Sequence, residues 1–205
     1  MEHPQIRTFQ LIQPEKVPEL INFIRSHSTE QRGSGAAGDE QNVLREPDGQ
    51  LWQLVKDLAS HITTYANEQY LDTHVCWHGS IREWQQGEYS DSHYDCYDES
   101  PDGDLFLMEA PAQNVFCDLA AILYLHDSED GRLIFDDLAV EYAPRAGECV
   151  VFPSTVRHRV SEVTGERLTI CHFLSRARTI ALGANRMLAG WGSEMYDASP
   201  AIALL

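Results

Sequence analysis

Apolar residues at helical spacing predict two helices in the first third of the chain. Pro18 can open the first helix, whose apolar positions are Leu20, Ile21, Phe23 and Ile24. The second helix follows Asp48 and has one long apolar face, formed by Leu51, Leu54, Val55, Leu58, Ile62 and Tyr65. Between them, residues 32–40 have the glycine-rich composition of a flexible loop. This part of the chain is therefore expected to support a core that lies further along.

From about His74 the pattern changes to short runs of β-branched and aromatic residues separated by turn signals. The predicted strands are His74–Trp84, Asn114–Leu125, Arg132–Phe135, Glu148–Phe152, His158–Val163 and Arg167–Leu174. Such spacing is typical of an antiparallel barrel or jelly roll preceded by helices. We expect one domain, with N-terminal helical support over 1–73, a β core over 74–175 and a C-terminal extension over 176–205.

Composition places the chain among globular proteins and limits its partners. Hydrophobic residues make up 43% of the chain, and no apolar run approaches the length of a membrane span. The formal net charge of −17 argues against general nucleic-acid binding, which needs a basic surface. The N-terminus lacks the features of a signal peptide, and the five cysteines form no CxxC pair. We expect a cytoplasmic protein with neither a membrane nor a nucleic acid as partner.

The sequence Ser92–His93–Tyr94–Asp95 carries the first candidate chemistry. Residues two apart in an extended segment share a face, so His93 and Asp95 can present an imidazole and a carboxylate to one point. Such a pair arises easily by chance, but His158, after an apolar strand and a proline-containing turn, supplies a third ligand. Two histidines and one carboxylate with open positions are typical of oxygen-activating non-heme iron. We expect these three residues to be the metal ligands and the catalytic centre.

Arg167 is a candidate for binding a carboxylate next to this metal. It lies nine residues beyond His158, and a turn at Thr164–Gly165 would send the chain back antiparallel toward the same cavity. A guanidinium holds a carboxylate through two parallel hydrogen bonds. Thr169 shares the face of Arg167 and can add a hydroxyl donor. By itself Arg167 would more often be a solvated strand residue, so the case depends on the histidine before it.

From about Trp84 to Ser175 the chain resembles the Fe(II)/2-oxoglutarate-dependent oxygenase superfamily, particularly its prolyl 4-hydroxylase-like branch. The matching stretches occur in the family's order: Trp84–Tyr89, His93–Asp95, Ala121–Leu125, Gly147–Pro153 and His158–Thr169. This resemblance implies a mainly β fold, a double-stranded β-helix (a jelly-roll or cupin-like core) with flanking helices. It also implies that Tyr124, Arg167 and Thr169 bind the cosubstrate.

The resemblance implies a dioxygenase that uses Fe(II), 2-oxoglutarate and O₂, with ascorbate as a supporting reductant. The family converts 2-oxoglutarate to succinate and CO₂ while it hydroxylates an unactivated C–H bond. A peptidyl residue, a free amino acid or another small molecule all remain open as substrate. Two departures bear on the substrate more than on the iron: Gly131–Arg132 replaces a Gly-Gly pair of many relatives, and His126 replaces an asparagine.

Two other functions fit part of the pattern. A cupin-like protein can bind or sense metal without turnover, but it has no need of the carboxylate-binding pair Arg167 and Thr169. An iron halogenase needs a halide where a carboxylate would bind, and Asp95 argues against it. Because one triad is already complete, we expect the nearby histidines to be structural or at the surface: His74, His78 and His126. The acidic loop after Asp95 is expected to help select the substrate.

Overall fold

The computed structural model describes residues 4–32, 42–45, 50–95, 97–99, 101, 105–107 and 117–176. This part of the chain holds two α-helices and two short 3-10 helices: η1 (Pro14–Lys16), α1 (Val17–His27), α2 (Gln50–Tyr70) and η2 (Asp136–Leu138). None of these helices is both long and apolar enough to cross a membrane. Both predicted α-helices are confirmed, and each buries the apolar face that its spacing defines.

Seven antiparallel strands form the larger sheet, in the order β1-β11-β8-β13-β4-β3-β2. They are β1 (Arg7–Gln10), β2 (Thr29–Arg32), β3 (Asn42–Arg45), β4 (His74–Trp84), β8 (Leu119–Tyr124), β11 (Glu148–Pro153) and β13 (Arg167–Arg176). The central strands β8, β11 and β13 are almost continuously buried. Strands buried on both faces read as apolar runs because helices cover one side and a second sheet covers the other.

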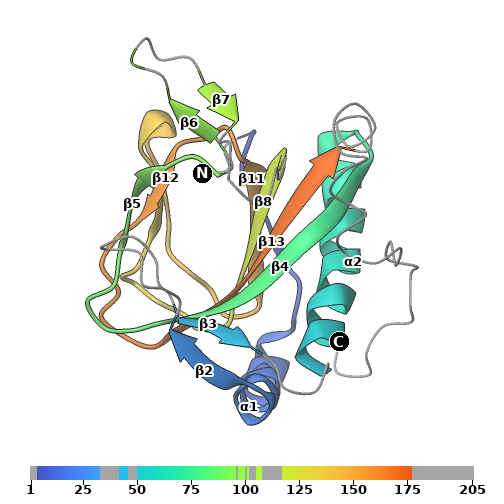
Figure 1. The fold of residues 1–205 in the computed structure, drawn as a ribbon, viewed down its shortest axis with the longest axis vertical. Coiled ribbons are helices and arrows are strands. Elements are labelled where there is room, and N and C mark those ends of the chain that lie inside the picture. Colours follow the sequence, from blue (N-terminus) through green and yellow to red (C-terminus); the bar gives the residue numbers. More distant parts are fainter. Residues whose placement is uncertain are drawn as a thin grey trace.

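The second sheet has four antiparallel strands, in the order β10-β9-β12-β5. They are β5 (Ser90–His93), β9 (Leu133–Phe135), β10 (Val140–Tyr142) and β12 (His158–Val160). A separate hairpin of β6 (Tyr97–Glu99) and β7 (Leu105–Leu107) projects from one end of the molecule (Figure 1). The hairpin lies within the acidic loop that was expected to select substrate, and most of the rest of that loop lies outside the described residues.

Two hydrophobic clusters lie on opposite faces of the larger sheet. One joins the helices to the sheet and includes Leu58, Leu123 and Ile170. The other fills the space between the two sheets and includes Tyr124 and Phe152. Figure 1 shows α2 along the outer face of β4 and β13, with the second sheet on the other side. Along β8 and β13, successive side chains point alternately toward the helices and toward the second sheet. Every second side chain on these strands therefore faces the space between the two sheets.

The expected fold class is confirmed: the protein is mainly β, with two antiparallel sheets of a double-stranded β-helix and flanking helices. All six predicted strands are present, but the first 73 residues also supply three strands that periodicity does not reveal, β1, β2 and β3. β2 reads Thr-Glu-Gln-Arg, which has no apolar alternation. β2 is a strand because it pairs with β3, although its own sequence does not favour one. The predicted C-terminal extension lies almost entirely outside the described residues.

Candidate active site

Two strands of the smaller sheet bring the predicted metal ligands together. β5 pairs antiparallel with β12 so that His93 is directly opposite His158, and their ring centroids are 4.4 Å apart. Asp95 follows two residues after His93, as expected for a shared face. Its carboxylate oxygens lie 3.8 Å from Nε2 of His93 and 3.5 Å from Nε2 of His158. One ligand atom from each residue therefore lies within 4.8 Å of the other two.

Backbone carbonyls fix both imidazoles in the same tautomer. Nδ1 of His93 lies 2.7 Å from the carbonyl oxygen of Asp91, and Nδ1 of His158 lies 3.0 Å from that of Val156. A carbonyl oxygen only accepts, so each Nδ1 carries the proton and donates it. Each Nε2 then keeps its lone pair and points toward Asp95. This is the arrangement in which histidine binds a metal, with the other ring nitrogen held by an acceptor.

Burial differs sharply between the two histidines. The side chain of His158 is 4% exposed and packs against Phe135 and Phe152, whereas that of His93 is 46% exposed. Burial lowers the pKa of His158, with the nearby Asp95 carboxylate acting in the opposite direction. The neutral imidazole that results is the form that binds a metal. The centre is therefore walled by aromatic side chains on one side and open on the side of His93.

Arg167 is buried between the sheets without a carboxylate partner. The residue is 2% exposed, and no carboxylate in the described part of the chain lies within ion-pair distance of it. Its Nη1 donates to the carbonyl oxygen of Gly131, and its Nη2 lies 3.4 Å from the hydroxyl of Tyr124. Its Nε is buried and has no hydrogen-bond partner among the described residues. Burial lowers the pKa of this guanidinium, and the nearby Tyr124, Cys171 and Asp130 only partly oppose that shift.

Aromatic rings hold the guanidinium in place. Its central carbon lies 4.6 Å from the ring centroid of Trp84 and 5.0 Å from that of Tyr124. Trp84 donates through Nε1 to the hydroxyl of Thr169 at 3.2 Å. Thr169 and Tyr124 are opposite each other in the β13–β8 register. The three predicted cosubstrate residues, Arg167, Thr169 and Tyr124, thus form one buried group, which also includes Trp84.

Tyr124 is a neutral hydrogen-bond donor in this group. Burial raises the pKa of Tyr124 well above its ordinary value, and the nearby Arg167 acts against that shift. The phenol therefore keeps its proton at neutral pH. Because its oxygen accepts from Arg167, its own hydrogen is available to a second acceptor placed beside the guanidinium.

Gly131 is a site residue whose role the sequence analysis did not identify. Its φ is +55°, and a Cβ at this position would lie 3.0 Å from Nη1 of Arg167 and 3.0 Å from a methyl carbon of Val163. Glycine is required here by both the left-handed backbone and the close approach of the guanidinium. The next residue, Arg132, is half-buried and contacts Glu129 and Glu141. Of the Gly-Gly pair in many relatives, the chain thus keeps the glycine that touches Arg167.

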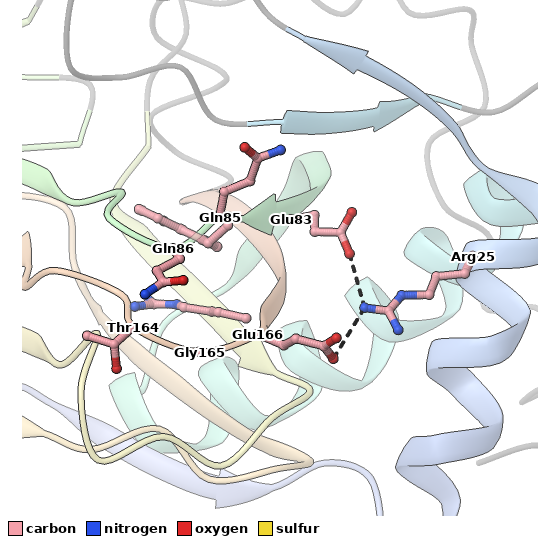
Figure 2. A pocket seen from close by; sticks show the side chains of 9 residues that line it. Arg25, Glu83, Gln85, Gln86, Thr164, Gly165 and Glu166 are labelled. Carbon is pink, nitrogen blue, oxygen red and sulfur yellow. Dashed lines mark hydrogen bonds and ion pairs between the residues drawn. The ribbon is translucent and has the colours of Figure 1, made fainter.

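A pocket of about 430 Å³ adjoins Arg167 at the end of β4 and the turn before β13. Arg25 of α1 lines one side of this pocket and bridges Glu83 at 3.1 Å and Glu166 at 3.6 Å (Figure 2). Neither the histidines nor the aspartate of the metal centre lines it. The pocket therefore lies beside the arginine end of the site and not beside the metal end.

The histidines expected to be structural contact residues outside the metal centre. His74 is buried and bonded to Asn67. His126 contacts the backbone of Leu168 and the carboxylate of Glu166. The side chain of His78 is outside the described part. Four cysteines, Cys76, Cys117, Cys149 and Cys171, are free and buried, as expected for reduced thiols.

Comparison with known proteins gives the same family that the motifs indicate. The sequence model of the 2OG-Fe(II) oxygenase superfamily matches residues 79–175, a range that contains the triad and Arg167. Among curated proteins, no sequence matches this chain.

Solved structures of low sequence identity share the fold. A viral collagen prolyl hydroxylase from Paramecium bursaria Chlorella virus-1, in complex with 2-oxoglutarate, is 15% identical with a TM-score of 0.55, over 83% of this chain and 94% of that one. A Pseudomonas putida prolyl-4-hydroxylase is 16% identical with a TM-score of 0.56, over 84% and 92%. The α-ketoglutarate-dependent epimerase SnoN from nogalamycin biosynthesis is 16% identical with a TM-score of 0.60, over 84% and 78%.

At these identities the structures establish the fold, and the family model matches residues 79–175, slightly less than half of the chain. The resemblance recognised in the motifs is confirmed to that extent: this segment matches the 2OG-Fe(II) oxygenase superfamily model, and the structural neighbours include prolyl 4-hydroxylase-like enzymes.

Proposed function

We propose that the protein is an Fe(II)- and 2-oxoglutarate-dependent dioxygenase. His93, Asp95 and His158 hold the iron, and Arg167 with Tyr124 and Thr169 holds the distal carboxylate of 2-oxoglutarate. The observation that carries this proposal is the buried guanidinium of Arg167, which has no carboxylate partner among the described residues and comes from the larger sheet, whereas the triad comes from the smaller sheet packed against it.

The charge of Arg167 requires an anion. Burying an isolated ion costs several kcal/mol even after the protein relaxes, and a carboxylate bound through two hydrogen bonds offsets that cost. Nε is without a partner and Nη2 makes only a long bond to Tyr124, so the guanidinium has donors to offer. A dicarboxylate whose other end reaches the metal satisfies both centres. A protein that only binds or senses metal has no use for this second centre.

The metal donors fit iron of the oxygenase type. Two imidazoles, each with Nδ1 next to a backbone carbonyl oxygen, and one carboxylate converge on one point, and the exposed side of His93 leaves room for further ligands. When bound there, Fe(II) would activate O₂ for oxidative decarboxylation of 2-oxoglutarate and oxidation of a C–H bond. The chain's own part is to keep both Nε2 lone pairs available and to exclude water on the side of Phe135 and Phe152.

Tyr124 and Thr169 complete the carboxylate site in different ways. The hydroxyl hydrogen of Tyr124 is available to a carboxylate oxygen, because the Tyr124 oxygen already accepts from Arg167. The hydroxyl of Thr169 accepts from Trp84, and its neighbours as acceptors are the carbonyl oxygen of Arg82 at 3.5 Å and the Cys171 thiol. Its hydrogen can turn from these weak acceptors to a charged one.

For the reaction on the organic substrate we propose hydroxylation of an unactivated C–H bond in a peptidyl residue or a small molecule. The prolyl hydroxylases with the same fold support a peptidyl substrate, and the epimerase with the same fold supports a small one. The β6–β7 hairpin, which starts two residues after Asp95, is our candidate for substrate selection. The free, buried cysteines support a reducing, cytoplasmic location.

Succinate formation from 2-oxoglutarate tests the function. The purified protein should produce succinate only when Fe(II), 2-oxoglutarate and O₂ are all present, with ascorbate prolonging turnover. A screen of proline-containing peptides and free amino acids should then identify substrates that raise the rate. Asp95→Ala should be inactive under every condition. Equal succinate formation by wild type and Asp95→Ala would contradict the proposal.

A further inference from the structure

His126 lies just beyond the paired part of β8 and β13, where a side chain replaces the backbone as the hydrogen-bond acceptor. The backbone N–H of Leu125 donates to the carbonyl oxygen of Leu168 at 3.0 Å. The N–H of Leu168 in turn donates to Nδ1 of His126 at 3.2 Å. The imidazole thus takes the place of a backbone acceptor at the end of the ladder, because the register between the two strands ends at Thr169 and Tyr124.

This one bond fixes the protonation state of His126. A backbone N–H only donates, so Nδ1 must be unprotonated and the ring's proton sits on Nε2. Nε2 lies 3.6 Å from a carboxylate oxygen of Glu166, which suits a ring nitrogen that carries a proton. The neutral Nε2–H ring therefore satisfies both neighbours. A second proton would go to Nδ1, where it would face the Leu168 N–H and break the bond.

Leu168 is the residue between the two members of β13 that are proposed to hold 2-oxoglutarate, Arg167 and Thr169. It is fully buried, so its N–H would find no water if the imidazole ceased to accept. A buried donor left without a partner costs more than the bond itself contributes. If the peptide unit between Arg167 and Leu168 moved, the guanidinium of Arg167 would lose its contact with the Trp84 ring.

We propose that His126 is a positioning residue that makes 2-oxoglutarate binding sensitive to acid, by releasing the N–H of Leu168 when its ring takes a second proton. This inference rests on the proposed function of Arg167 and adds a form of regulation to it. His126 is not among the residues proposed to hold the cosubstrate or the iron, and its proposed effect passes through the start of β13.

The groups around His126 set the pH range of the effect. Burial lowers its pKa below the ordinary value, and the positive charge of Arg25 acts in the same direction. The carboxylates of Glu166, Glu83 and Asp127 act in the opposite direction. Since the folded pKa is lowered, the stabilising effect of the neutral ring is complete above the unfolded value of about 6.5 and is lost as the pH falls below it.

Two substitutions separate the ability of residue 126 to accept a hydrogen bond from Leu168 from its ability to take up a proton. His126→Asn places an amide oxygen near the position of Nδ1, so it can still accept from Leu168 but cannot titrate. His126→Gln extends its amide toward the position of Nε2 and offers no acceptor at the nearer position. The apparent KM for 2-oxoglutarate at saturating Fe(II), and the melting temperature of the metal-free protein, are measured for each variant between about pH 8 and about pH 5.

In wild type the KM should rise on acidification by roughly tenfold more than in His126→Asn, a change of about the size expected for one lost buried hydrogen bond. The melting temperature should fall more steeply in wild type than in the asparagine variant. His126→Gln should show the raised KM already at about pH 8. If the asparagine variant follows the wild-type pH profile in both measurements, the proposal is overturned.

The metal-free melting curves keep this inference separate from the proposed function. If the protein fails to turn over 2-oxoglutarate at any pH, the proposed function is contradicted. The acid-dependent difference in melting temperature between wild type and His126→Asn would still show whether the imidazole holds β13. Identical melting profiles would remove His126 from that role.

Discussion

His93 and His158 lie directly opposite each other in the antiparallel pairing of β5 and β12, and each donates Nδ1–H to the carbonyl of the residue two positions before it. This register places the two imidazoles on one side of the smaller sheet with both Nε2 atoms toward Asp95. The site therefore follows from strand pairing and local backbone bonds, and its geometry is established before any metal binds.

Substitution of a triad residue should abolish metal binding and turnover. His93→Ala, Asp95→Ala and His158→Ala each remove one ligand, and loss of one of three protein ligands leaves the iron too weakly held for activity. Metal content after anaerobic loading with Fe(II), measured together with succinate formation, checks this expectation. Asp91→Ala is the matched control, because it removes a nearby carboxylate but keeps the backbone carbonyl that orients His93. Full metal content in any triad variant would remove that residue from the ligand set.

Gly131→Ala should weaken 2-oxoglutarate binding without releasing the metal. The new methyl group would meet Nη1 of Arg167 at 3.0 Å, on a backbone whose φ of +55° already disfavours alanine. The cost is of order 1–3 kcal/mol, so the apparent KM for 2-oxoglutarate should rise by about tenfold or more. Gly165→Ala serves as control, since nothing lies within 4 Å of a Cβ there. A normal KM in Gly131→Ala would show that the guanidinium has room to adjust.

A stability prediction concerns the end of α2. Leu71 follows the last helical residue with a φ of 51°, and the residue is 90% exposed. Any residue with a Cβ is strained in the left-handed region, and the exposure of the Leu71 side chain means that little packing is lost when it is removed. Leu71→Gly should raise the free energy of unfolding by about 0.5–1 kcal/mol in denaturant titrations. Leu71→Ala keeps the strained conformation and should not stabilise; an equal gain in both variants would contradict the explanation.

The sequence predicted those helices and strands whose buried residues form a recognisable pattern of apolar positions. β8, β11 and β13 read as apolar runs because both faces are covered, and α1 and α2 show their apolar faces directly. The grouping of His93, Asp95 and His158 was predictable because residues two apart on an extended segment share a face and His158 begins a strand. The short strands β2 and β3 were missed, since β2 is polar throughout, β3 has only two apolar residues, and both are strands through pairing with each other and, for β3, with β4.

Relations between residues distant in the sequence were the least predictable part of the site. The contact of Gly131 with Arg167 joins positions 36 residues apart, and that of His126 with Leu168 joins positions 42 apart. The sequence analysis singled out Gly131–Arg132 and His126 as departures from the family pattern. It gave no indication that Gly131 and His126 contact neighbouring residues of β13, Arg167 and Leu168.

The most direct test of the central claim is anaerobic calorimetric titration of 2-oxoglutarate into the Fe(II)-loaded protein and its Arg167 variants. Wild type should bind one 2-oxoglutarate per iron, and binding should be lost when the metal is removed. Arg167→Ala should keep its iron but lose roughly tenfold to a hundredfold in affinity, because a charge-assisted bond contributes about 1.5–3 kcal/mol. Arg167→Lys should recover only part of that loss, since lysine restores charge without the two-pronged geometry. Unchanged affinity in Arg167→Ala, or equal binding by the metal-free protein, would contradict the account.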